Sequence, residues 1–199
     1  MKRSLLLAVV LVGLAVLSTS CDIFGGKADY YPLSIGSIWN YSWRMTVNDS
    51  VWASGTLKVE AVKEEQLTSG EKVVMLVSTS TGGTDTSYAR KDGEKVWSYS
   101  ALNDTSPDLA FDGPPAIDKT WNVNEAVTAK IVAKENVTVA AGTYKNCWKI
   151  ELTTITDADT TKSHMWLADG TGHVKSYAEE ESGGITMKMT VELTSATIK

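Results

Sequence analysis

The sequence predicts an all-β protein, a curved antiparallel meander of about ten or eleven strands that forms a half-open or closed barrel, with a β-sandwich as the alternative. Three observations favour this fold class. Apolar and polar residues alternate with a period of two, glycine-containing turns recur at hairpin spacing, and a 3.6-residue helical periodicity is absent. Abundant Thr, Val, Trp and Tyr residues also suit the half-buried surface of a sheet.

Five segments carry the clearest alternation, each with apolar side chains at every second position. One apolar face and one polar face are typical of an antiparallel sheet that packs one side on the core. In chain order the segments are 39–43, 57–61, 97–99, 148–152 and 185–193.

Turn sequences separate these segments. Asp92-Gly93 predicts a two-residue type I′ hairpin turn, in which both central residues have positive φ. The stretch 104–115 predicts a long loop between two halves of the sheet. The only helices we expect are short, one before Ser34 and one near Leu109.

The N-terminus has the pattern of a signal peptide. Lys2 and Arg3 precede an apolar run of 13 residues, 5–17. A membrane-spanning helix needs about 20 apolar residues, so this run is too short to span and predicts the hydrophobic region of a signal peptide.

Cys21 is the predicted site of lipid attachment. Small uncharged residues lead into it, in an arrangement that resembles the bacterial lipobox, which predicts cleavage after Ser20 and acylation of the Cys21 thiol. Two or more acyl chains hold a protein firmly to a bilayer without a spanning helix. The alternatives are plain secretion, with Cys21 free or bridged to Cys147, and an uncleaved anchor.

We therefore expect three parts: a signal peptide at 1–20, a lipidated flexible tether at 21–31, and a single antiparallel β domain at 32–199. Gly25 and Gly26 favour a flexible tether. Removal of residues 1–20, which hold two basic and no acidic residues, moves the net charge from −5 to −7. An acidic domain argues against nucleic acid as a partner. Beside Trp148, Cys147 is expected to be a small buried residue.

Three segments resemble motifs of a family of uncharacterised bacterial lipoproteins. Residues 31–41 (YPLSIGSIWNY) resemble "YFPLxxGNxWxY", residues 137–147 (VTVAAGTYKNC) resemble "VxVPAGTFxxC", and residues 166–175 (WLADGTGHVK) resemble "YYAPGVGLVK". The resemblance implies a lipoprotein-localisation-factor-like (LolA/LolB-like) fold, a curved sheet with an apolar concave face. It implies no catalytic residues, and Ala140 and His173 depart from the motifs.

Seven tryptophans accompany only two phenylalanines. Most are expected to fill the core, but a curved sheet has a second face, and some tryptophans are candidates for an apolar groove there. The candidate groove residues are Trp39, Trp43, Trp97, Trp148 and Trp166.

Residues for catalysis or metal binding are sparse. His164, His173 and Asp169 form a candidate metal site if a hairpin brings the two histidines together, but structural metal sites usually have three or four closely spaced ligands. No serine lies in a Gly-x-Ser-x-Gly elbow. We therefore expect no enzyme activity, no metal and no cofactor.

The expected function is that of an exported, membrane-anchored lipoprotein of the bacterial cell envelope that binds an apolar or lipid-like ligand in the concavity of its sheet. The first alternative is a structural or interaction lipoprotein with a filled core and no small-molecule site. The second, less favoured, is a hydrolase or metal-dependent enzyme.

Overall fold

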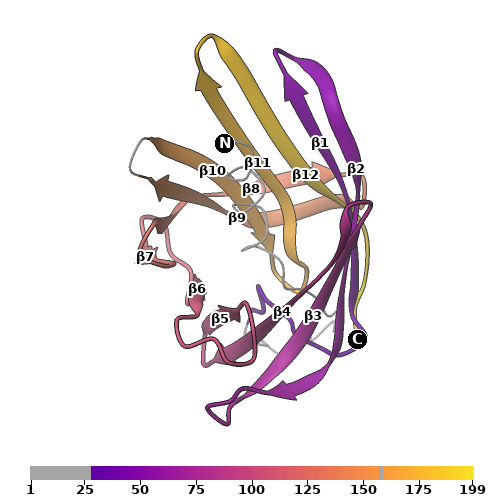
Figure 1. Ribbon diagram of the computed structural model, residues 1–199, viewed down its shortest axis with the longest axis vertical. Helices are drawn as coiled ribbons and strands as arrows, with labels where there is room; N and C mark the ends of the chain where they lie inside the picture. The colour runs from indigo at the N-terminus through magenta and orange to yellow at the C-terminus, as the bar shows by residue number, and fades with distance from the viewer. Residues whose placement is uncertain (1–27, 157–158) are drawn as a thin grey trace.

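The computed structural model describes residues 28–156 and 159–199. Within these residues twelve antiparallel strands form a single sheet, and no helix occurs (Figure 1). The predicted antiparallel meander is confirmed, and the sandwich alternative is wrong because every strand belongs to one sheet. Ser20 and Cys21, with the rest of the predicted signal peptide and most of the tether, lie outside the described residues. The strands are β1 (Ile38–Val47), β2 (Ser50–Gln66), β3 (Lys72–Ser80), β4 (Gly83–Asp92), β5 (Lys95–Tyr99), β6 (Asp108–Asp112), β7 (Thr120–Asn122), β8 (Val127–Val139), β9 (Gly142–Ile155), β10 (Thr160–Ala168), β11 (Gly172–Ser182) and β12 (Ile185–Thr197).

The sheet curls until its two edges meet. Its order is β6-β5-β4-β3-β2-β1-β12-β11-β10-β9-β8-β7, so each strand lies beside its neighbours in the chain, and β1 also pairs with β12. The edge strands β6 and β7 are joined by a hydrogen bond from the Leu109 amide to the Val123 carbonyl, 2.9 Å, and by one from Trp121 Nε1 to the Leu109 carbonyl, 3.0 Å. The result is a nearly closed barrel.

The period-two pattern places the predicted apolar residues inside. Trp39 and Tyr41 of β1 are fully buried, and Val191 and Leu193 of the neighbouring β12 pack with them in one large core cluster. The end of the β8–β9 hairpin folds across to β12, where the Ala141 amide donates to the Leu193 carbonyl at 3.1 Å. The interior is therefore filled by side chains.

Two local predictions are wrong. Leu109 lies in strand β6 rather than in a helix, and this strand divides the loop expected at 104–115. Residues 28–33, the described part of the chain before Ser34, form no helix either. Both segments are short. Leu109 is held at the seam with β7 and Tyr31 packs on Phe111 of β6, contacts that a local pattern does not reveal.

The turn expected at Asp92-Gly93 is displaced by one residue. Asp92 pairs with Lys95, so the central residues are Gly93 and Glu94, and of these only Gly93 has positive φ, 61°. A positive φ at the first central position alone is typical of a type II′ turn, in which glycine is favoured.

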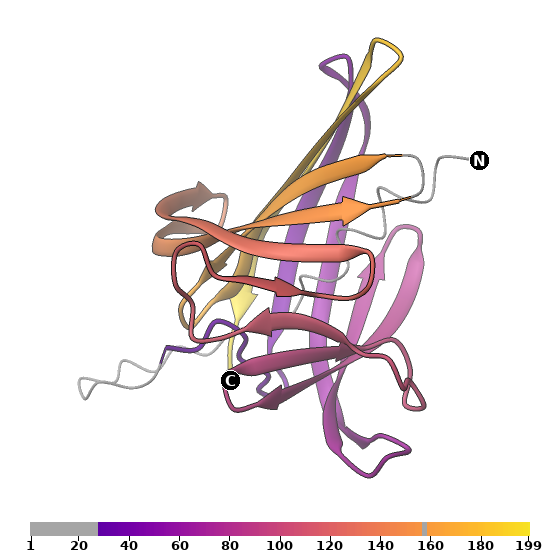
Figure 2. The ribbon, with the colours of Figure 1, turned by 90° about the vertical axis from the view of Figure 1, so that its left-hand side faces the viewer.

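Two hairpins project together beyond the rest of the barrel (Figures 1 and 2). One is formed by β1 and β2 and the other by β11 and β12, and β1 pairs with β12 up to Val47 opposite Met187. The Asn48 amide donates to the Thr186 carbonyl at 2.9 Å, and the Thr186 amide donates to Asn48 Oδ1 at 3.0 Å. The two hairpin tips are thus fixed side by side.

Candidate functional site

The described chain begins with a short segment that is fixed to the sheet. The Asp29 carboxylate accepts hydrogen bonds from Lys91 Nζ at 2.6 and 2.7 Å, and the Asp29 carbonyl accepts one from the Gly170 amide at 2.9 Å. The Asp29 amide donates to Asp169 Oδ1 at 2.8 Å. Residues 29–31, which the sequence analysis placed in the tether, are therefore part of the folded domain.

Tyr31 is the residue that holds this segment in the core. Its side chain is 2% exposed, its ring centroid lies 5.3 Å from that of Phe111, and its hydroxyl donates to the Ala110 carbonyl at 3.4 Å. Burial raises the pKa of Tyr31 well above its usual value, so the phenol stays neutral. The start of the domain thus packs against β6.

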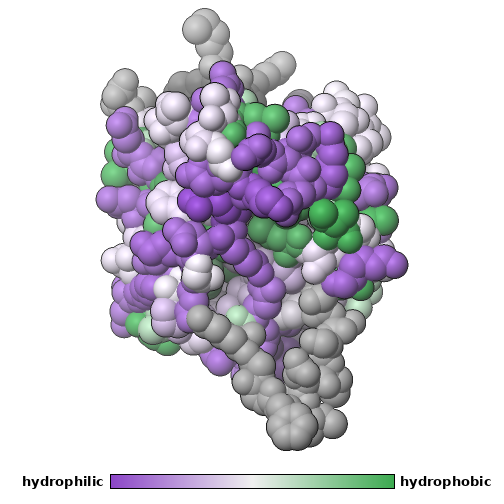
Figure 3. Space-filling view, turned by 90° about the horizontal axis from the view of Figure 1, so that it is seen from below, coloured by the Kyte–Doolittle hydropathy of each residue, from purple (hydrophilic) through white to green (hydrophobic). Residues whose placement is uncertain are grey.

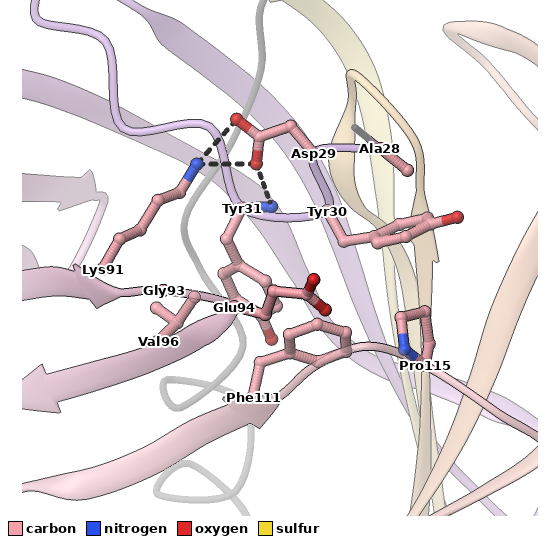
Figure 4. A pocket seen from close by; sticks show the side chains of 10 residues that line it. All are labelled: Ala28, Asp29, Tyr30, Tyr31, Lys91, Gly93, Glu94, Val96, Phe111 and Pro115. Atoms are coloured by element: carbon pink, nitrogen blue, oxygen red, sulfur yellow. Dashed lines mark hydrogen bonds and ion pairs between the residues drawn. The ribbon is translucent and has the colours of Figure 1, made fainter. Parts of the chain in front are cut away.

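A cavity of about 210 Å³ opens beside this segment (Figure 4). It lies between residues 28–31, the β4–β5 turn, β6 and Pro115. The carboxylate of Glu94 lies among the aromatic rings of this site in the close-up view. The residues that give the cavity its chemical character are Asp29, Tyr30, Tyr31, Lys91, Glu94 and Phe111.

Asp29, Lys91 and Glu94 bring two carboxylates and one ammonium group to the cavity. Asp29 and Lys91 neutralise each other in a pair whose side chains are 39% and 36% exposed, so the pair stabilises the fold only modestly. Burial is the main cause that raises the pKa of Tyr30. At about 210 Å³ the cavity is smaller than the roughly 300–1,000 Å³ of ordinary small-molecule sites.

The five candidate groove tryptophans do not line this cavity. Trp39 is fully buried, and Trp97 packs on a separate small cluster with Leu67, Val73 and Tyr99. Trp43 lies against Gly55, its cross-strand neighbour. The structure therefore does not gather these residues around one groove.

Trp148 and Trp166 are covered by lysines. Lys134 Nζ lies 4.6 Å from the centroid of Trp148, and Lys149 Nζ lies 5.1 Å from that of Trp166. Trp166 Nε1 also donates to Glu135 Oε1 at 2.6 Å. Both rings are less than a tenth exposed and pack in the main core cluster, so little of their surface is open to a ligand.

The two histidines lie in different environments. His173 is fully buried, with its ring 5.4 Å from that of Tyr41, whereas His164 is partly exposed and lies 3.6 Å from Glu151. The Asp169 carboxylate accepts a hydrogen bond from the Asp29 amide in the N-terminal segment. Among the residues that the structure describes, no three His, Cys, Asp or Glu side chains are grouped to hold a metal ion. The metal version of the enzyme hypothesis thus finds no site in this geometry.

Cys147 is a buried free thiol, as expected. Burial raises its pKa to about 11, so the reactive thiolate is scarce at neutral pH. Its Sγ donates a weak hydrogen bond to the Tyr144 carbonyl at 3.5 Å. This environment suits a packing role and not a nucleophile.

Sequence reasoning missed the cavity residues and one exposed tryptophan. Lys91 and Glu94 lie in one hairpin, but Asp29 joins them only because the first described segment folds back onto that hairpin, so no local pattern marks the three together. Trp52, by contrast, is 62% exposed at a hairpin tip. Trp52 follows Asn48-Asp49, a turn in which both residues have positive φ. This turn sequence could have predicted that Trp52 lies exposed at a hairpin tip.

The fold and this site define a class of protein: a single barrel-like antiparallel sheet with a filled interior and a small cavity where the chain enters the domain. Within the described residues, no helix is long and apolar enough to cross a membrane. No protein-family model matches the chain, and no curated protein matches it.

Two solved structures share the fold. The first, from Bacteroides fragilis NCTC 9343, is provisionally described as an exported protein with a YmcC-like fold; it is 16% identical, with a TM-score of 0.53, over 86% of this chain and 100% of that chain. The second, from Parabacteroides distasonis ATCC 8503, is provisionally described as a lipoprotein; it is 13% identical, with a TM-score of 0.50, over 87% of this chain and 100% of that chain. At these identities the likeness shows the fold alone. The resemblance to LolA and LolB stays a prediction.

Proposed function

We propose that this chain is an exported, lipid-anchored protein of the bacterial cell envelope, without enzyme activity, whose domain acts through its surface. The observation that carries the proposal is the filled interior, in which Trp39, Tyr41, Ile131, Ile150 and Leu193 are each at most 1% exposed. Such a core leaves no room for an acyl chain in the concavity. It therefore favours the interaction lipoprotein over the carrier of an apolar ligand.

The N-terminal end supports the anchored arrangement. Asp29 is fixed to both the β4–β5 turn and the β10–β11 turn, only eight residues after Cys21. The names of the two structural neighbours, one exported and one a lipoprotein, agree with the lipobox-like sequence at Ser20 and Cys21. The face seen from below is mostly hydrophilic, with separate hydrophobic groups, which suits a surface in water (Figure 3).

Metabolic labelling tests the anchor. Cells that express the full chain are given an alkyne analogue of palmitate, and the chain is isolated and analysed by intact mass. We expect a labelled chain that begins at Cys21 and fractionates with membranes, and an unlabelled Cys21→Ser chain. The matched variant Cys147→Ser should be labelled as the wild type is. An unlabelled wild-type chain would contradict the proposed lipid anchor.

Native mass spectrometry tests the finer choice between a filled core and an apolar ligand. The Cys21→Ser chain is mixed with dioleoyl phosphatidylethanolamine or palmitate and sprayed from a volatile buffer. We expect the mass of the chain alone in both mixtures. Stoichiometric retention of either lipid would restore the carrier hypothesis.

A further inference from the structure

The seam between β6 and β7 is the weakest joint in the barrel. Among the residues that the structure describes, a ladder of paired residues joins each strand to its neighbours in the sheet, but no such ladder joins β6 to β7 where the sheet closes. The two strands are joined instead by the main-chain hydrogen bond from Leu109 to Val123 and by the side chain of Trp121. Elements held by few main-chain hydrogen bonds open locally at the lowest free energy, so the barrel should open first at this seam.

A second connection between the two halves of the sheet runs through the start of the domain. Residues 28–37, the N-terminal strap, lead into β1 without regular secondary structure. Asp29 pairs with Lys91 at the end of β4 and is hydrogen-bonded to Asp169 and Gly170 in the β10–β11 turn. Counted from the seam, β4 belongs to the half that ends in β6, and β10 belongs to the half that ends in β7. The strap therefore bridges the two halves beside the seam.

The aromatic rings of the strap continue into the seam itself. The ring centroids of Tyr30 and Tyr31 lie 6.1 and 5.3 Å from that of Phe111 in β6. Phe111 in turn meets Trp121 of β7 edge-on at 6.0 Å. The Tyr31 hydroxyl also donates to the carbonyl of Ala110, the residue before Phe111, at 3.4 Å. Phe111 is thus packed between the strap and the strand on the far side of the seam.

We propose that the N-terminal strap is a latch for the seam: when the strap detaches, β6 separates from β7 while the other strands stay paired. Detachment removes the two tyrosine rings from Phe111, and the seam then depends on one main-chain hydrogen bond and on Trp121. The remaining strands keep their ladders of main-chain hydrogen bonds, so the open state is local and not a general unfolding.

The strap detaches from its outer end. The polar contacts of Asp29 lie at the surface, where an ion pair contributes little stability, whereas Tyr31 is 2% exposed. Release should therefore begin at Asp29 and reach Tyr31 and the seam afterwards. If the chain is lipid-anchored as proposed above, a pull on the tether acts on Asp29 first. This last step alone rests on the proposed function.

Hydrogen exchange of the Cys21→Ser chain, followed by NMR, tests the latch. The reporter is the Leu109 amide, which donates across the seam. Asp29→Ala removes the pair with Lys91 and the hydrogen bond that Asp29 Oδ1 accepts from the Tyr31 amide at 3.0 Å. We expect it to speed exchange at Leu109 about tenfold. The amides that pair β1 with β12 should exchange at the wild-type rate.

Two lysine variants provide a matched comparison. Lys91→Ala removes the ion pair of the strap alone and should speed exchange at Leu109 by about threefold. Lys188→Ala removes a similar pair with Asp49 at 2.7 Å, at the hairpin tip. The two lysine side chains are 36% and 33% exposed, so the variants differ mainly in location. Lys188→Ala should leave exchange at Leu109 unchanged.

Tyr31→Leu tests the deeper attachment. The variant keeps an apolar side chain against β6 but removes the ring and the hydroxyl, so it should speed exchange at Leu109 more than Lys91→Ala does. Asp29→Ala leaves all the aromatic rings in place and decides the question should Tyr31→Leu fail to fold.

Three results would overturn the latch. They are an unchanged Leu109 rate in Asp29→Ala, an acceleration that is equal across the whole sheet, and an equal acceleration by Lys188→Ala. The Cys21→Ser chain carries no lipid, so these results do not depend on the anchor. A failed latch leaves the palmitate result standing, and an unlabelled wild-type chain leaves the latch standing.

Discussion

His173 is a histidine that the fold keeps neutral. It is fully buried beside Tyr41, and its Nε2 hydrogen-bonds Ser176 Oγ. Burial lowers the pKa of His173 to about 4, far below the value near 6.5 of an exposed histidine. Protonation of this ring therefore costs free energy in the folded protein and not in the unfolded chain.

This burial predicts a loss of stability in acid. As pH falls from 6.5 to about 4, the unfolded chain binds a proton on this histidine and the folded protein does not, so the free energy of unfolding decreases. The decrease across that window is on the order of 3 kcal/mol. Urea unfolding at pH 7.5, 6, 5 and 4.5 measures it.

A pair of variants assigns the effect. His173→Gln should flatten the profile between pH 6.5 and 4.5, whereas His164→Asn, at a partly exposed ring, should change it much less. Burial also lowers the pKa of His164, so its contribution has the same sign. Equal profiles for wild type and His173→Gln would contradict the assignment.

The alternation of residues does not distinguish these two histidines. Each lies within a strand, and the sequence analysis treated them as a possible pair. A bulge between Trp166 and Leu167 shifts the register, so His173 lies opposite Leu167 and His164 opposite Tyr177. Bulges depend on the partner strand, which a single-sequence pattern does not contain.

At the level of the strand, Gly55 makes room for Trp43. The two residues are cross-strand neighbours, and a Cβ built on Gly55 would lie 2.9 Å from the indole ring. An aromatic ring that covers a glycine in a neighbouring strand restores packing that the glycine lacks. Gly55 is thus a packing position in β2 rather than a turn.

Gly55→Ala should destabilise the protein by about 1–3 kcal/mol, because the indole must shift. Gly82→Ala is the control, since its nearest atom is Ser80 Oγ at 3.6 Å; that change should be neutral or slightly stabilising. Urea unfolding of both variants checks the difference. Adding Trp43→Ala to Gly55→Ala should cost less than the sum of the two single changes, and an additive result would refute the contact.

The strands were largely predictable, and their ends were not. Segments with sustained alternation, such as 148–152 and 185–193, lie in β9 and β12. The expected face is buried throughout the first segment and from Met189 onward in the second, where Ile185 is 48% exposed. The short strands β6 and β7 were not predicted, because five and three residues are too few to show an alternation of apolar and polar residues. They exist because the two edges of the sheet meet there.

The closure of the whole molecule depends on that seam. Trp121 is 6% exposed, stacks edge-on against Phe111 at 6.0 Å, and donates from Nε1 to the Leu109 carbonyl. One ring therefore joins β6 to β7. Closure removes two long free edges, which would otherwise invite pairing between molecules.

Trp121→Phe should weaken the seam while it keeps most of the packing. The lost hydrogen bond, which is partly buried, should cost about 0.5–1.5 kcal/mol. Hydrogen exchange of the Leu109 amide should become faster, because this amide donates across the seam. Trp52→Phe, at an exposed position, should change neither stability nor exchange at Leu109.

The sequence predicted a half-open or closed barrel without deciding between the two, and it did not predict the cavity. The period-two pattern shows that one face is dry, but it does not fix how many strands curl around it. The cavity depends on Asp29 and Lys91, residues 62 positions apart that meet because the first segment folds back onto the β4–β5 turn. Long-range contacts of this kind lie outside any window of local sequence.

The pairing of β1 with β12 bears on the order in which this chain acquires its structure. Ile38 lies opposite Thr197, and the Lys199 amide donates to Ser37 Oγ at 3.2 Å. The middle of the sheet is therefore completed only when the last strand arrives, after a loop of some 150 residues has closed. Distant pairings of this kind form slowly. The middle of the sheet stays open in a nascent chain until β12 has emerged, which agrees with the proposed export of the chain, because translocation precedes folding.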